Sequence, residues 1–166
     1  MPNRDARTPT VRTARSCDVE AITALHVEVQ RVHHEAEPLA YKAPATDASR
    51  ELVETRLADP TTHYLVAEAE DGQIVGFLLA AARPGHDTPL THARPFVEVD
   101  EMCVAPAYRH QGVARSLSDQ AARWARDQGI GEIRLSVRNF NQAAQRAYAR
   151  MGFLPVQHRL TLALVD

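Results

Sequence analysis

Cysteine is scarce in this sequence, and the signals of export and membrane insertion are missing. Cys17 and Cys103 are the two cysteines among 166 residues, so we expect neither a disulfide framework nor a thiolate metal site. No apolar run reaches the length of a membrane span. Residues 1–9 are polar and lack the apolar stretch of a secretory signal, so we predict a disordered tail there. These absences favour a cytoplasmic protein that does not contact a membrane.

An excess of charge of either sign is also absent. The formal net charge is -2 at pH 7, whereas nucleic-acid-binding domains usually carry a basic excess. The histidines show no ligand spacing with an acidic or cysteine partner. We therefore expect neither a nucleic acid nor a metal ion as a partner. A hydrophobic fraction of 45% and a length of 166 residues fit one globular domain with a sizeable core.

The hydrophobic pattern of residues 10–166 predicts strands and helices in mixed order. Apolar or alternating runs predict strands at 10–15, 63–69, 74–82, 96–104, 132–137 and 153–164. Helical spacing and capping residues predict helices from Ser16 or Asp18 to just before Pro38, from a cap at Asp47 to Asp59, over 112–127 and over 142–151. Asp71-Gly72 indicates a hairpin, and the prolines of 83–95 indicate an irregular segment. The order favours a single α/β (α+β) domain over residues 10–166, with one mixed sheet and helices on both faces.

The turn after the 96–104 strand has the features of a phosphate-binding loop. Arg109-His110-Gln111-Gly112-Val113-Ala114 leads from the strand into a helix. A helix start presents unpaired backbone N–H groups and the positive end of the macrodipole. Gly112 and Ala114 leave room for close approach, and Arg109, His110 and Arg115 can add positive charge. A tight turn that binds nothing would use the same glycine, and the pattern is neither Gly-x-Gly-x-x-Gly nor a P-loop.

Two further groups of residues have both a functional and an ordinary interpretation. Asn141, Ala144 and Tyr148 share one face of the predicted 142–151 helix. Asn141 would also serve as a helix N-cap, and Tyr148 as a core aromatic residue. Glu98, Asp100 and Glu101 lie in the 96–104 strand, where burial of carboxylates is costly unless they line a cleft or form ion pairs.

These motifs together resemble the GNAT N-acetyltransferases. Residues 104–114 are similar to that family's acetyl-CoA loop, with its Gln/Arg-x-x-Gly-x-Gly/Ala pattern. Asn141, Ala144, Tyr148 and Gly152-Phe153 follow at the spacing of the family's late helix. The resemblance implies a three-layer fold in which a twisted mixed sheet of about six to seven strands splays open between strands four and five.

The resemblance also implies acetyl-CoA as co-substrate and a set of residues that bind it. Backbone groups of Met102, Cys103 and Val104 would pair with the pantetheine arm. The segment that would hold the pyrophosphate comprises Arg109, His110, Gln111, Gly112, Val113, Ala114 and Arg115. Asn141 would bind the arm or an ordered water, and Tyr148 would lie beside the thioester sulfur.

The implied reaction is acetyl transfer to a primary amine of a small molecule or peptide. Some members place a glutamate as base in the fifth strand, but this chain has Ser136 there. The catalytic residues expected are therefore Glu98 or Asp100 as base and Tyr148 as acid. Glu101 stays open, because strands of this family often bulge here. The acceptor pocket is expected from 32–42 and 83–95, where Glu35, Glu37 and Asp87 would suit a cationic amine.

Other classes of function fit part of the same pattern. A non-catalytic acyl-CoA sensor would share the loop without the chemistry, and a structural α/β protein would bind nothing there. The long strand predicted at 153–164 could pair with a second copy, so a homodimer is a further expectation.

Overall fold

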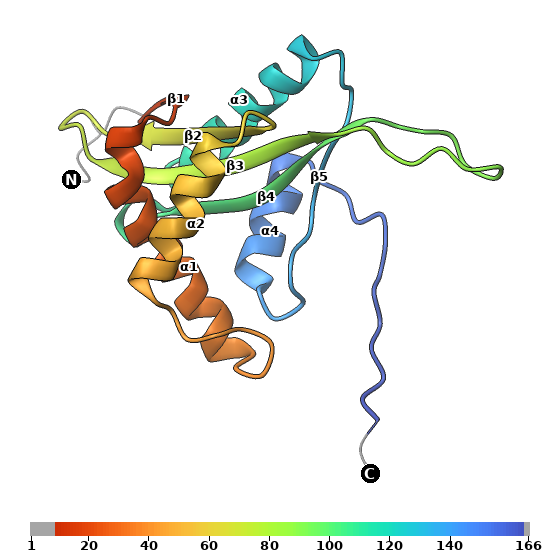
Figure 1. The fold of residues 1–166 in the computed structure, drawn as a ribbon, viewed down its shortest axis with the longest axis horizontal. Helices are drawn as coiled ribbons and strands as arrows, with labels where there is room; N and C mark the ends of the chain where they lie inside the picture. Colours follow the sequence, from red (N-terminus) through yellow and green to blue (C-terminus); the bar gives the residue numbers. More distant parts are fainter. Residues whose placement is uncertain (1–8, 165–166) are drawn as a thin grey trace. The chain divides into compact units, whose positions relative to one another are not determined.

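The computed structural model describes residues 9–164, which fall into two compact units that divide between Ser136 and Val137 (Figure 1). The predicted tail, residues 1–9, lies outside the described residues except for Pro9, which is buried. In the first unit, β1 (Thr10–Thr13) and a short 3-10 turn (Ser16–Asp18) precede α1 (Val19–Ala36) and α2 (Thr46–Ala58). The unit continues with β2 (Thr62–Glu68), β3 (Ile74–Arg83), β4 (Phe96–Val104), α3 (Val113–Asp127) and β5 (Ile133–Leu135). The second unit contains α4 (Gln142–Met151).

The five strands of the first unit form one mixed sheet in the order β1-β2-β3-β4-β5. The first four strands are antiparallel neighbours, and β5 is parallel to β4. The pairing of β4 with β5 runs only from Val97↔Ile133 to Val99↔Leu135. Within the described residues, 101–104 of β4 are thus paired with β3 alone. The sheet opens between its fourth and fifth strands, as the resemblance predicts.

Helices cover both faces of this sheet and close two separate cores (Figure 1). On one face, α3 buries Val113, Leu117 and Ala121 against strand residues such as Leu78 and Val97. On the other face, α1 and α2 bury a second set against β2 and β3: Ile22, Leu25, Val53, Tyr64 and Phe77. Successive side chains of a strand point to opposite faces, which is why both cores draw on the same strands.

A β-bulge in β4 changes which residues face which helices. Leu79 pairs with Glu101 and Ala80 pairs with Val99, so Asp100 is the extra residue of β4. In a flat strand Val99 and Cys103 would share a face. Instead Val99 packs in the α3 core and Cys103 packs in the α1/α2 core. Glu101 lies two positions before Cys103 and therefore shares its face. The bulge thereby places Glu101 on the α1/α2 side of the sheet.

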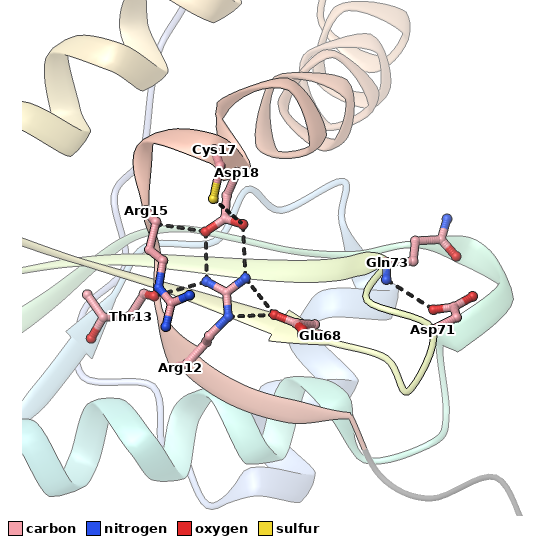
Figure 2. Close-up of polar contacts among 8 residues, drawn as sticks. All are labelled: Arg12, Thr13, Arg15, Cys17, Asp18, Glu68, Asp71 and Gln73. Atoms are coloured by element: carbon pink, nitrogen blue, oxygen red, sulfur yellow. Dashed lines mark hydrogen bonds and ion pairs between the residues drawn. The ribbon is translucent and has the colours of Figure 1, made fainter.

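An arginine in β1 fixes the point where α1 begins (Figure 2). Arg12 donates to both carboxylate oxygens of Asp18, at 2.7 and 3.0 Å, and to Glu68 in β2 at 2.5 Å. The Asp18 carboxylate also accepts the backbone N–H of Arg15 at 2.7 Å. Asp18 therefore stands at the start of α1, as expected for a cap, but its side chain binds the strand rather than the helix. Its carboxylate has a pKa below the ordinary value, chiefly because of the hydrogen bond from Arg12.

Two predictions about these elements are wrong. Residues 153–164 form no strand, and their leucines are exposed, Leu160 by 91% and Leu162 by 82%. Alternating leucines define a face, but a strand also needs a hydrogen-bonding neighbour. The described sheet accordingly has five strands rather than six to seven. The cap of α2 is Ala45, and Asp47 lies in its first turn, where a carboxylate still favours the helix dipole. Among the described residues no helix combines the length and apolarity needed to cross a membrane.

Candidate active site

The turn between β4 and α3 presents backbone donors without partners. Among the described residues, none is hydrogen-bonded to the backbone N–H groups of 111–114, and the first helical bond runs from Ser116 N–H to the Gly112 carbonyl at 2.9 Å. Side chains brace the turn from behind: Arg109 Nε donates to the Val104 carbonyl at 3.0 Å, and Gln111 Nε2 to the Ala107 carbonyl at 2.8 Å. The turn therefore presents N–H groups without a hydrogen-bond partner among the described residues at the positive end of α3.

Glycine at 112 is required by conformation rather than by crowding. Gly112 has φ +83°, a left-handed value that a side chain resists. A Cβ placed there would meet no atom within 4 Å, so the space in front of the turn is open. His110 has φ 63°, so the chain reverses sharply just before the helix. These features, together with the half of β4 that has no β5 partner, fit an extended ligand that carries a diphosphate.

A cavity of about 240 Å³ lies between the α1/α2 pair and the sheet. Its lining combines apolar residues with ionisable ones: His26, Leu52, Val53, Arg56, Tyr64, Leu79, Asp100 and Glu101. Tyr64 is 3% exposed, and burial raises the pKa of its hydroxyl, with a further contribution from the charge of Glu101. A small polar molecule with an apolar portion would fit such a lining.

Two of the predicted carboxylates share one cation. Arg83 lies 3.3 Å from Glu98 and 3.4 Å from Asp100, measured between guanidinium nitrogen and carboxylate oxygen. Burial raises the pKa of Asp100, whereas the charge of Arg83 opposes that rise. Asp100 lines the cavity and Glu98 does not.

Glu101 has a different partner on the opposite side of the bulge. His26 Nε2 lies 3.2 Å from a Glu101 oxygen, and His26 Nδ1 lies 3.0 Å from Ser49 Oγ. His26 is 7% exposed and Ser49 is 4% exposed. A carboxylate, an imidazole and a hydroxyl thus form a continuous chain from β4 through α1 to α2.

Asn141 and Tyr148 belong to the second unit. Asn141 is the N-cap of α4, and its Oδ1 accepts the Ala144 N–H at 3.1 Å, which confirms its capping role. Tyr148 is half-buried and packs edge-on against Phe153, with ring centroids 5.7 Å apart. Their expected contacts with a cofactor stay predictions.

Sequence reasoning missed His26, Ser49, Arg56 and Tyr64. No residue of 32–42 or 83–95 lines the cavity, so the role of Glu35, Glu37 and Asp87 in binding an acceptor also stays a prediction. One available signal was the position of His26 beside Leu25 in the apolar stripe of α1. Within residues 9–164, no group of three or more His, Cys, Asp or Glu side chains could hold a metal ion.

The sequence profile of the acetyltransferase (GNAT) family matches residues 14–153. The chain belongs to this family. Streptothricin acetyltransferase of Streptomyces lavendulae is 36% identical over 95 residues, which are 57% of this chain and 46% of that protein. N-acetyltransferase 8B of Mus musculus is 31% identical over 123 residues, 69% of this chain and 51% of that protein. The chain spans about half the length of these curated relatives.

Solved structures of other proteins show the same fold at low sequence identity. The BH1408 protein of Bacillus halodurans, as a tetramutant, superposes with a TM-score of 0.88 at 19% identity over 93% of this chain and 99% of that one. The aminoglycoside N-acetyltransferase AAC(6')-Iy, solved in complex with CoA, superposes with a TM-score of 0.70 at 18% identity. The match covers 95% of this chain and 100% of that one. The fold expected from the sequence is therefore confirmed.

Proposed function

We propose that this GNAT protein transfers the acetyl group of acetyl-CoA to a primary amine of a small molecule. The observation that carries the proposal is the set of unpartnered N–H groups at 111–114, in the turn that follows the half of β4 without a β5 partner. A diphosphate needs several converging donors, and an amide-containing arm needs a strand edge. The names of two similar proteins, a streptothricin and an aminoglycoside acetyltransferase, support a small-molecule amine as acceptor.

The β4–α3 turn would hold the pyrophosphate, with Arg109, His110 and Arg115 adding positive charge nearby. Backbone groups of Met102, Cys103 and Val104 would pair with the pantetheine arm. Asn141 would bind the same arm or an ordered water. When bound, acetyl-CoA supplies an activated thioester: a C–N bond forms, the C–S bond breaks, and the sulfur leaves with the electron pair and takes up a proton.

The acceptor has to lose a proton before its nitrogen can attack. A primary amine has an ordinary pKa of about 10, so it is mostly ammonium near neutral pH. The carboxylates of β4, Glu98, Asp100 and Glu101, are the candidate bases. Tyr148 would protonate the departing thiolate, and its replacement in Tyr148→Phe is expected to lower kcat and to alter its dependence on pH.

Two glycine variants test the cofactor site with a matched control. Gly112 and Gly129 both have positive φ, +83° and +72°, and neither would place a Cβ within 4 Å of another atom. Alanine at either position costs about 1 kcal/mol of backbone strain. We expect Gly112→Ala to weaken acetyl-CoA binding about tenfold in calorimetry, equivalent to about 1.4 kcal/mol. Gly129→Ala should bind like the wild type, because it lies at the other end of α3.

Turnover separates this proposal from a sensor that only binds acetyl-CoA. The wild type is expected to release free CoA thiol when supplied with streptothricin, aminoglycosides or polyamines. Tight binding without thiol release above background for any amine would favour the sensor. No binding of CoA or acetyl-CoA by folded protein would refute both.

A further inference from the structure

We propose that Glu101 is the base that deprotonates the acceptor amine, and that His26, held by Ser49, is the positioning residue that keeps its carboxylate in place. The inference rests on the proposed acetyl transfer and specifies its proton-transfer step. In this step the N–H bond of the ammonium breaks, its electron pair stays on nitrogen, and the proton forms an O–H bond with Glu101.

The order of carboxylate, imidazole and hydroxyl in this hydrogen-bonded series decides which reaction it can support. Ser49 is 4% exposed and does not line the cavity, so its hydroxyl is not placed to attack a substrate. Glu101 lines the cavity at the opposite end of the chain. A serine at the exposed end would indicate nucleophilic catalysis. A carboxylate at the exposed end indicates proton acceptance.

His26 can support Glu101 in either of its own protonation states. With Nε2 protonated, the ring donates to the Glu101 carboxylate across 3.2 Å. The other nitrogen, Nδ1, lies 3.0 Å from Ser49 Oγ, and a hydroxyl can either donate or accept. Both ring nitrogens therefore keep a partner whether His26 is neutral or cationic. Burial makes such full satisfaction necessary, because an unpaired polar group there would be costly.

Asp100 and Glu98 are less suited to accept the proton. Both oxygens of Asp100 lie near the Arg83 guanidinium, at 3.4 and 3.5 Å, and Glu98 contacts the same side chain. Arginine stays charged in proteins. Protonation of either carboxylate would break an ion pair with a permanent cation, whereas the partner of Glu101 is an imidazole, whose N–H donates a hydrogen bond even when the ring is neutral.

Five variants distinguish these assignments, using acetyl-CoA and a primary amine that the wild type acetylates. Glu101→Gln should lower kcat by about 10²-fold or more near neutral pH. The lost rate should return as pH rises, because the free amine fraction then grows. Asp100→Asn makes the same change of charge in the same cavity, and it should lower kcat by a smaller factor than Glu101→Gln does. His26→Gln keeps a donor toward Glu101 but cannot carry a charge, and should lower kcat about tenfold and change the dependence of kcat on pH.

The ionisable groups that line the cavity together with His26 are Asp100 and Glu101 from β4, Arg56 from α2 and Tyr64 from β2. Ser49→Ala should reproduce part of the loss of kcat seen in His26→Gln. Ser49→Thr keeps the hydroxyl and should behave like the wild type. A merely structural role for His26 would lower stability but leave the pH profile of kcat unchanged.

Acetyl-CoA binding provides the control for the whole set. Unchanged affinity in every variant, measured by calorimetry, would place the losses in the chemical step. The proposal is overturned if Asp100→Asn loses more kcat than Glu101→Gln, or if His26→Gln and Ser49→Ala keep the wild-type profile. Failure of the proposed function would look different, because the wild type itself would then bind or consume no acetyl-CoA.

Discussion

The two faces of the sheet differ in what they bury. The core under α3 is built from aliphatic side chains, Leu117 and Val113 among them. The buried polar or charged side chains of the described residues are Asp18, Thr23, His26 and Ser49, and all lie in the 3-10 turn, α1 or α2. Burying polar groups costs free energy that an apolar face avoids. The α3 face thus serves mainly stability, whereas the α1/α2 face carries the buried polar groups that the proposed function would use.

The largest expected effect comes from truncating the apolar face. Leu117 has 0% exposure at the centre of the α3 core. Leu117→Ala should reduce the free energy of unfolding by about 3–5 kcal/mol, through lost transfer energy and a residual cavity. Denaturant unfolding measures the change. A loss below about 1 kcal/mol would contradict the view that this face carries the stability of the unit.

A smaller loss is expected where a buried carboxylate loses its cation. Arg12→Met leaves Asp18, 5% exposed, without its ion-pair partner, at an expected cost of about 3 kcal/mol near neutral pH. The folded pKa of Asp18 is depressed, so this contribution is present above its ordinary value of 3.8 and is lost as pH falls through the lower folded value. The difference between wild type and variant should therefore shrink below about pH 3.8. A difference independent of pH would exclude the ion pair as its cause.

The comparison of the two faces is sharpened by a variant that should gain stability. Thr23 is 2% exposed, and its hydroxyl has no hydrogen-bond partner among the described residues. Thr23→Val removes this unsatisfied group with little change in shape and should raise the free energy of unfolding by about 1 kcal/mol. Thermal and denaturant unfolding both report the gain. An equal loss would mean that the hydroxyl makes a contact of its own.

The mildest test leaves the protein unmutated and compares its two thiols. Burial raises the pKa of Cys103 to about 12, whereas Cys17 is exposed. A thiol reagent near pH 8 should modify Cys17 quickly and Cys103 only after denaturation. Fast reaction of both thiols in folded protein would show that the α1/α2 core opens readily.

Local signals in the sequence were sufficient for most of the fold. The predicted bounds of 96–104 and 142–151 coincide with β4 and α4, because apolar periodicity and flanking residues act over a few positions. The failure at 153–164 has the same origin, since periodicity carries no information about a neighbouring strand. The loop at 109–115 could be singled out because a strand, a glycine and a helix start adjoin in sequence.

The cavity between the α1/α2 pair and the sheet could not be predicted in this way. His26 meets Ser49 across 23 positions and meets Glu101 from yet another element. Such contacts depend on how α1 and α2 pack on the sheet, and on a bulge that alternation alone does not reveal. Without the bulge, the sequence pattern groups Glu101 with Val99 and misplaces its carboxylate.

The bulge has one more consequence, because Asp100 is surplus to the hydrogen-bonding ladder of β3 and β4. If Asp100 were deleted, every other residue of β4 would stay on the face that it now occupies. The bulge therefore adds a carboxylate to the lining of a cavity while the core residues of β4 keep their places. Deletion or replacement of Asp100 would change the charge that lines this cavity and leave the neighbouring core positions unchanged.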